Sequence, residues 1–175
     1  VLANNILGYA QFPGGACATD GVVIHTNAFG RGNYPLFTTF NKGRTATHEV
    51  GHWANLRHIW GDTTCGNDFV ADTPVHNTSN GGCPAYPHLS TCSGSPVEMT
   101  MNYMDYTDDR GMYMFSIEQK SRMLAIFAVG VGLFLGKLNW GIAAATAAGV
   151  GIIFSAPKLV AFLSGSDANS TCPTT

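Results

Sequence analysis

The spacing of three histidines in residues 45–62, "TATHEVGHWANLRHIWGD", constrains the fold of this chain more than any other feature. Each residue of an α-helix advances about 100° and 1.5 Å, so His48 and His52 lie one turn apart on one face. Ten residues of continuous helix would carry His58 roughly 15 Å along the axis and off that face. His58 can join the other two only if the helix breaks after His52. Asn55 provides the break, because asparagine readily adopts the left-handed conformation that ends a helix and reverses the chain.

Three imidazoles around one point predict a catalytic Zn²⁺ site, since they leave the fourth tetrahedral position open. Glu49 lies one step round the helix from His48, which suits a base that takes a proton from a zinc-bound water. The expected reaction is hydrolysis, in which zinc polarises the scissile carbonyl and Glu49 passes the proton to the leaving amine. The alternative is a histidine-rich helix, because the five-residue HExxH pattern also arises by chance.

The longer motif, "HEVGHWANLRH", resembles the HExxHxxGxxH motif of the metzincin zinc peptidases, with Asn55 where most members have glycine. Residues 99–116, "MTMNYMDYTDDRGMYMFS", resemble the Met-turn region of the pappalysin family within the metzincins. The resemblance implies that Met104 forms a hydrophobic floor beneath the metal. It also implies that Tyr106 supports the oxyanion of the reaction intermediate. Ordinary core packing is the alternative for both side chains.

The segment "RHIWGDTTCGNDFVADTPVHNTSNGGCP" is similar to bacterial secreted, cytophagalysin-like members of the same family. The resemblance covers residues 6–127 and implies a secreted α+β zinc endopeptidase that cleaves proteins or peptides in a cleft between two subdomains. Family domains begin well before a strand such as "ILGYAQF", so we expect a truncated upper subdomain. Nine Lys and Arg against eleven Asp and Glu give no basic excess, which argues against a nucleic-acid partner.

Local patterns predict the elements around the histidine helix. Residues 6–12 and 21–29 are β-branched and aromatic runs separated by a Pro- and Gly-containing turn, as in two joined strands. The helix begins at about Thr45, with Thr45 or Thr47 as its cap. Residues 61–100 are rich in turn-forming residues and predict an irregular segment that covalent or ionic cross-links must stabilise. A second helix follows over 116–127, where Ser116 and Gln119 form a capping box.

The cysteines favour disulfides over a zinc ribbon, because there are five of them and no CxxC spacing. The resemblance implies a disulfide between Cys65 and Cys92. The family partner of Cys83 would fall at Gly111, so Cys83 is expected to be free or to pair with Cys17. The remaining cysteine is Cys172.

A second zinc site is the rival interpretation of the region after the histidine helix. Its candidate ligands would be Cys65, His76, Cys83, His88 and Cys92. Their irregular spacing disfavours this site, and we expect His76, His88 and His25 to be ordinary loop or strand histidines.

Two acidic groups carry further expectations. In "NDFVADTP" the hard oxygen donors are Asn67, Asp68, Asp72 and the Thr73 carbonyl. The family resemblance suggests structural Ca²⁺ there, and a solvated acidic loop is the alternative. Asp108 and Asp109 follow the Met-turn, where related enzymes place an acidic residue at the bottom of the S1′ pocket. That resemblance implies a preference for Arg or Lys directly after the cleaved bond.

The composition changes abruptly near Phe127, which predicts three segments: a peptidase domain over 1–127, an apolar helical hairpin over 128–165 and a polar tail over 166–175. Apolar runs on either side of residues 137–139 predict a transmembrane hairpin and membrane association through residues 128–163. A buried hairpin is the alternative. Residues 134–157, "FLGKLNWGIAAATAAGVGIIFSAP", resemble the small pilin subunits of conjugative type IV secretion systems.

The change at residues 127–130 is the pattern left by a gene fusion, a frameshift or an assembly join. The alternative function is therefore a membrane-embedded, pilin-like structural subunit that carries an inactive peptidase fragment.

Overall fold

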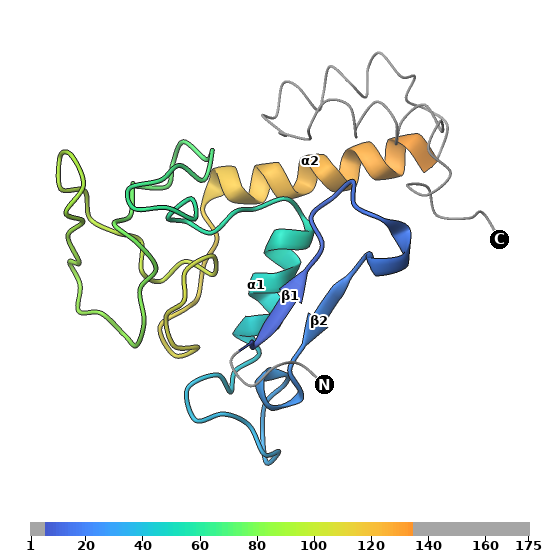
Figure 1. The fold of residues 1–175 in the computed structure, drawn as a ribbon, viewed down its shortest axis with the longest axis horizontal. Coiled ribbons are helices and arrows are strands. Elements are labelled where there is room, and N and C mark those ends of the chain that lie inside the picture. Colours follow the sequence, from blue (N-terminus) through green and yellow to red (C-terminus); the bar gives the residue numbers. More distant parts are fainter. Residues whose placement is uncertain (1–5, 135–175) are drawn as a thin grey trace.

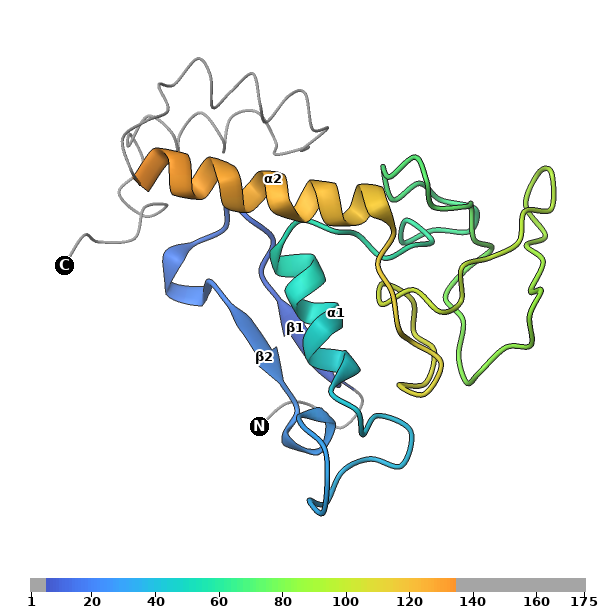
Figure 2. The same ribbon diagram turned by 180° about the vertical axis from the view of Figure 1, so that it is seen from behind.

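The computed structural model describes residues 6–134, which form an α+β fold built around one helix (Figure 1). The elements, in chain order, are β1 (Gly8–Ala10), η1 (Cys17–Thr19), β2 (Val22–Ile24), η2 (Thr26–Ala28), α1 (Arg44–Trp53) and α2 (Ile117–Phe134). The two strands lie on one side of α1 and a long irregular segment lies on the other, while α2 crosses over the C-terminal end of α1 (Figures 1 and 2). The helix that carries the histidines is therefore surrounded by all the other parts.

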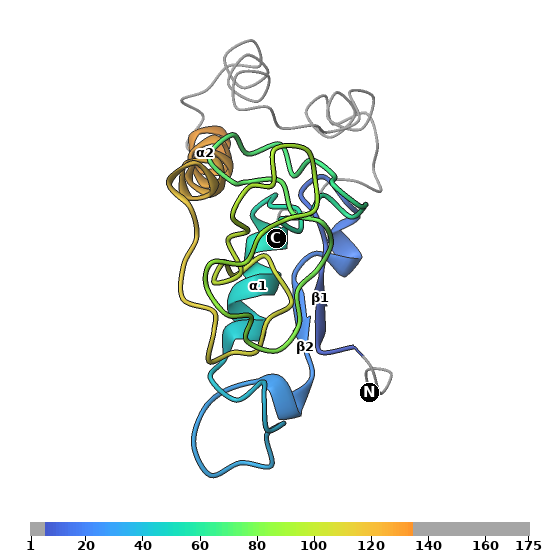
Figure 3. The same ribbon diagram turned by 90° about the vertical axis from the view of Figure 1, so that its left-hand side faces the viewer.

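The two predicted strands are confirmed, although each is shorter than its sequence pattern. They pair antiparallel, with Tyr9 opposite Val23. Figure 3 shows them side by side next to α1. β2 ends early because the His25 side chain accepts a hydrogen bond from the backbone N–H of Asn27 and starts the 3₁₀ turn η2. Gly8 is required in β1, because a Cβ there would lie 2.9 Å from the side chain of Glu49.

α1 begins one residue before the predicted start, and the predicted threonine cap is wrong. The N-cap residue is Gly43, with φ of 75°, and glycine has no side chain that could cap the helix. Instead, Oδ2 of Asp109 accepts hydrogen bonds from the backbone N–H groups of Lys42 (2.6 Å) and Arg44 (3.2 Å). A carboxylate from a distant segment thus satisfies the N–H of the first helical residue and of the residue before the N-cap, and it complements the positive end of the helix dipole.

The capping box predicted for α2 is confirmed. Gln119 Oε1 accepts from the Ser116 N–H at 2.9 Å, and Ser116 Oγ accepts from the Gln119 N–H at 3.1 Å. Asp72 adds a second cap, because its carboxylate accepts from Ser116 Oγ and from the N–H of Glu118.

The predicted end of the second helix near Phe127 is wrong, because α2 continues to Phe134. Residues 128–134 contain no proline, and each of their two glycines, Gly130 and Gly132, costs a helix only about 1 kcal/mol. Among residues 6–134 no helix is long and apolar enough to cross a membrane. Beyond residue 134, the predicted hairpin and the polar tail lie outside the described residues, so the three-segment division stays a prediction.

The segment 61–100 is irregular, as predicted, and a disulfide and backbone hydrogen bonds stabilise its conformation. The Cys65–Cys92 disulfide is present, with a Cα–Cα distance of 5.7 Å. Leu89 and Val97 form an isolated antiparallel bridge. The core lies where the chain after α1 meets residues 99–116. It consists of Leu56, Ile59, Trp60 and Met104, with Met99, Phe115 and Met123 packed against it.

Of the two expectations for Cys83, the free thiol is confirmed: the side chain is exposed and forms no disulfide. A Cβ built at Gly111 would lie 3.3 Å from the Cys83 sulfur, close to the separation across a disulfide. Gly111→Cys should therefore form a disulfide between Cys83 and the thiol introduced by the substitution, and raise the free energy of unfolding by about 2 kcal/mol. Peptide mapping without reductant and denaturant unfolding measure the two effects.

Gly81→Cys is the control, because a Cβ at Gly81 meets nothing within 4 Å. This variant should form no such bridge. The prediction is wrong if both thiols of the Gly111→Cys variant remain open to alkylation.

Candidate active site

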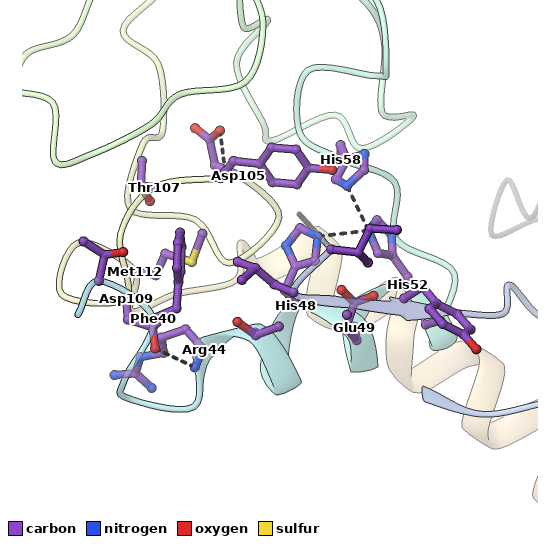
Figure 4. Close-up of a pocket in the computed structure, with 18 of the residues that line it drawn as sticks. Phe40, Arg44, His48, Glu49, His52, His58, Asp105, Thr107, Asp109 and Met112 are labelled. Carbon is purple, nitrogen blue, oxygen red and sulfur yellow. Dashed lines mark hydrogen bonds between the residues drawn. The ribbon is translucent and has the colours of Figure 1, made fainter. Parts of the chain in front are cut away.

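The chain reverses at Asn55, as the histidine spacing predicted. α1 ends at Trp53, Asn55 has φ of 73°, and the Leu56 N–H returns to the carbonyl of Gly51 at 2.9 Å. The reversal brings the third histidine back to the first two. His52 Nε2 lies 3.0 Å from His48 Nε2 and 3.1 Å from His58 Nε2, and Figure 4 shows the three rings turned toward one point.

The opposite nitrogen of each ring is held by an oxygen. Nδ1 lies 2.6 Å from the Tyr103 carbonyl in His48 and 2.7 Å from the Leu56 carbonyl in His52. In His58 it lies 2.5 Å from Oδ1 of Asp62. A carbonyl oxygen can only accept, so Nδ1 carries the hydrogen and Nε2 presents its lone pair. The Nε2 lone pairs of His48 and His58 therefore each lie 3.0–3.1 Å from that of His52 with no hydrogen between them. The lone pairs repel one another unless a cation lies between them.

The donor set fits zinc. Three nitrogens at Zn–N distances of about 2.0–2.1 Å in a tetrahedron lie about 3.3 Å from one another, close to the separations in this site. Burial also keeps the rings neutral. Burial, followed by repulsion from the neighbouring histidines, lowers the pKa of His48 to about 3 and that of His52 to about 4. Burial lowers the pKa of His58 as well, although Asp62 opposes the shift.

Glu49 lies beside the ligand rings, and Figure 4 shows its carboxylate below His48 and His52. Its side chain is covered by β1 at Gly8, and the residue is only 6% exposed. Burial raises the pKa of Glu49 to about 7. A carboxyl group with a pKa near neutrality can both accept and return a proton, as general acid–base catalysis requires.

Met104 and Tyr106 both lie at the site. Met104 is fully buried, and a Cβ at Gly51 would collide with its sulfur, so its side chain packs directly against the α1 turn between the first two ligands. The Tyr106 ring lies 4.8 Å from the His58 ring and is half exposed. Burial, together with the negative charges of Asp62 and Glu49, raises the pKa of Tyr106, so its hydroxyl stays a donor.

The ligands open into a cleft of about 860 Å³. Its lining comes from β1, the chain before α1, α1 itself and the Met-turn segment, including Gly8, Phe12, Phe40, Thr107, Asp109 and Met112. The two candidate S1′ carboxylates differ in their position relative to this cleft. Asp109 lines the cleft, whereas Asp108 is not part of the lining and its Oδ2 lies 3.6 Å from Nε of Arg110. Asp109 is 2% exposed, and Oδ2 is engaged at the start of α1.

The carboxylates of the predicted calcium loop bond to protein donors. Asp68 accepts from the Val70 N–H, and the Thr73 hydroxyl donates toward both of its oxygens at 2.9 Å. Burial raises the pKa of Asp68 to about 6. Asp72 caps α2, and Asn67 accepts from the Phe69 N–H.

The rival zinc site is wrong, because two of its five candidate ligands, Cys65 and Cys92, are joined in a disulfide. His76 is also unsuited to it. Its Nε2 accepts from the Met99 N–H, so Nδ1 carries the hydrogen, and Nδ1 lies 3.6 Å from Asp105 Oδ2. Within residues 6–134, only one group of three His, Cys, Asp or Glu side chains is close enough to share an ion, and it consists of His48, His52 and His58.

Sequence reasoning missed several residues that hold the site. Asp62 orients His58, and its position four residues after that histidine was a usable signal. Asp105, fully buried beside Tyr106, accepts from the N–H groups of Asn80 and Tyr106. Asn102 links the Met-turn to Gln119 through a 2.7 Å hydrogen bond. The contacts of Asp105 with Asn80 and of Asn102 with Gln119 span 25 and 17 residues, so they leave no local pattern in the sequence.

A three-histidine centre with a glutamate beside it, opening into a cleft, defines the class of zinc metallopeptidases. The peptidase M43 family model, described as Pregnancy-associated plasma protein-A, matches residues 2–128. The chain belongs to this family, the pappalysins, as the sequence motifs predicted.

Two fungal relatives are named extracellular metalloprotease. The protein from Pyricularia oryzae is 36% identical over 133 residues, covering 73% of this chain and 45% of its own. The protein from Sordaria macrospora is 38% identical over 128 residues, covering 69% and 44%. Among solved structures, Tannerella forsythia mature mirolysin in complex with a cleaved peptide matches with a TM-score of 0.66 and 47% identity, covering 72% of this chain and 49% of that one. The chain thus spans about half the length of these relatives.

The reversal at Asn55 gives a direct test of the site geometry. Asn55→Gly should keep zinc binding, because glycine adopts positive φ without penalty. Asn55→Ala should destabilise the turn by about 1–2 kcal/mol and weaken zinc binding, because alanine disfavours that conformation. Zinc content after gel filtration, measured by mass spectrometry, compares the two. Equal zinc retention by both variants would contradict the role given to the turn.

Proposed function

We propose that the protein is an extracellular zinc endopeptidase that hydrolyses peptide bonds in proteins or peptides. The observation that carries the proposal is the convergence of three Nε2 lone pairs on one point inside a cleft large enough for an extended peptide. Membership of the pappalysin family supports it, and so do the names of the fungal relatives. The Cys65–Cys92 disulfide suits an oxidising, extracellular setting.

In this proposal His48, His52 and His58 hold the zinc through Nε2. When bound there, zinc lowers the pKa of a water molecule and polarises the scissile carbonyl. Glu49 accepts the proton from the attacking water and then donates it to the nitrogen of the leaving amine. Burial raises the pKa of Glu49, which makes its carboxylate a stronger base than an exposed glutamate.

Tyr106 supports the oxyanion in this scheme. Its raised pKa keeps the phenol protonated, so that the hydroxyl can donate a hydrogen bond to the oxygen on which negative charge develops. Met104 has a different role: packed against α1 at Gly51, it keeps the turn between His48 and His52 in place.

Glu49→Gln tests the proposed base. Glutamine has nearly the same shape and leaves the three zinc ligands intact, but it cannot accept the proton. The variant should keep about one zinc per chain and lose cleavage of a casein or peptide substrate by on the order of 10²–10⁴-fold. Metal analysis and a fluorogenic peptide assay provide the two readouts.

Glu118→Gln is the matched control, since Glu118 lies at the start of α2 and does not line the cleft. It should cleave at the wild-type rate. The proposal would be wrong if the wild-type protein bound no zinc, or if the Glu49→Gln variant cleaved the substrate at the wild-type rate.

We further propose that Asp109 favours Arg or Lys directly after the cleaved bond. Of the two candidate carboxylates, only that of Asp109 lines the cleft. A charge-assisted hydrogen bond from a substrate Arg or Lys to this carboxylate would be worth about 1.5–3 kcal/mol. Asp109→Asn keeps an oxygen for the start of α1 and removes the charge. It should reduce the preference for Arg over Leu at this position about tenfold or more, measured as the ratio of kcat/KM values.

Asp108→Asn is the control and should leave the same ratio unchanged, because Asp108 is not part of the cleft lining. An unchanged ratio in Asp109→Asn would show that Asp109 serves α1 alone.

Structural Ca²⁺ in the loop of Asn67, Asp68, Asp72 and Thr73 remains a proposal resting on the family resemblance. The burial of Asp68 and its pKa of about 6 support it, since a cation would stabilise that carboxylate. Nothing in residues 6–134 favours the alternative of a pilin-like structural subunit.

A further inference from the structure

A buried arginine on α2 binds the turn that separates the second and third histidines. Arg122 is 6% exposed, and its Nε donates to the carbonyl of Asn55 at 3.0 Å. Its Nη1 donates to the carbonyl of Phe69 at 2.9 Å. In Figures 1 and 2 the chain that leaves α1 runs alongside the first turns of α2, where Arg122 lies. One guanidinium thus joins α2 to two turns that precede it by 67 and 53 residues.

Both carbonyl groups belong to residues in the left-handed conformation, with φ of 73° at Asn55 and 63° at Phe69. Such turns leave carbonyl groups that a helix or strand would otherwise satisfy. A guanidinium is planar and carries its donors in fixed directions, so it fixes the spacing of two acceptors as well as satisfying them. A lysine can satisfy one acceptor but cannot hold both in that geometry.

The Asn55 turn controls two of the three ligands. The next carbonyl, that of Leu56, orients His52 through Nδ1 at 2.7 Å. Two residues further on is His58, whose ring stacks on Trp60 at 4.3 Å. A shift of the Asn55 carbonyl would therefore move the partner of His52 and the backbone of His58 together.

We propose that Arg122 is a positioning residue for the metal centre, and that it sets the geometry of His52 and His58 through the Asn55 turn. The proposal rests on the proposed zinc function. It differs from a role in stability, because it requires that the affinity of the folded protein for zinc depend on a side chain that is not itself a ligand. Asp68, 4% exposed, lies near enough to offset the guanidinium charge, so the arginine is retained in the interior at a tolerable cost.

The test compares Arg122→Gln and Arg122→Lys with wild type. The dissociation constant for zinc is measured by chelator competition, well below the unfolding temperature of each apo protein. Partners that orient metal ligands typically change affinity 10–100-fold, so we expect zinc binding to weaken roughly tenfold or more in both variants. The visible absorption of the Co²⁺-substituted proteins should change as well, because it reports the geometry of the ligands without any need for activity.

Arg57→Gln is the matched control: it removes the same charge from the same neighbourhood, where Arg57 lies over the Phe69 ring at 4.9 Å. The dissociation constant of this variant for zinc should stay within twofold of the wild-type value. If Arg122→Gln does not fold, Arg122→Lys, which keeps the charge beside Asp68, decides the question. Zinc affinity and Co²⁺ spectra like those of wild type in the folded Arg122 variants would overturn this inference alone. A wild-type protein that binds no zinc would overturn the proposed function and this inference with it.

Discussion

The repulsion among three unprotonated ring nitrogens is the interaction on which the rest of this structure depends. Each Nδ1 is committed to an oxygen, so each Nε2 must present a lone pair, and these lie 3.0–3.1 Å apart around His52. Without a cation this arrangement costs free energy, and other contacts must hold it. The contacts made by α1 and by the chain that follows it are arranged around this requirement.

α1 is held at both ends and on two sides. Asp109 accepts from the N–H of its first residue, Arg44, and Arg122 binds the turn after its last residue. Met104 packs against Gly51 on one side, and β1 approaches Glu49 through Gly8 on another. Three of these four contacts come from residues 104–122, whose irregular part would have little reason to be ordered on its own. The Ser116–Gln119 capping box and the buried hydrogen bond from Asn102 to Gln119 anchor it to α2.

The sequence predicted what depends on neighbours along the chain. The helical spacing of His48 and His52, the reversal at Asn55 and the Ser116–Gln119 capping box all follow from local rules, and the structure confirms each. The errors arose where distant side chains decide the outcome. Asp109 caps α1 from 65 residues away, while Asp105 binds Asn80 and Arg122 binds Asn55, contacts that only the fold makes possible. Cys65–Cys92 was predicted from family resemblance, since five cysteines allow many pairings.

The most direct test of this account is the coordination of zinc in the purified wild-type chain, measured by X-ray absorption at the zinc edge. The account predicts one zinc per chain with three imidazole nitrogens at about 2.0–2.1 Å, one further light atom and no sulfur. A sulfur neighbour at about 2.3 Å would place the metal at a cysteine, and fewer than three imidazoles would show that His58 does not return to the site. Either result would contradict the convergence of His48, His52 and His58 on a single ion.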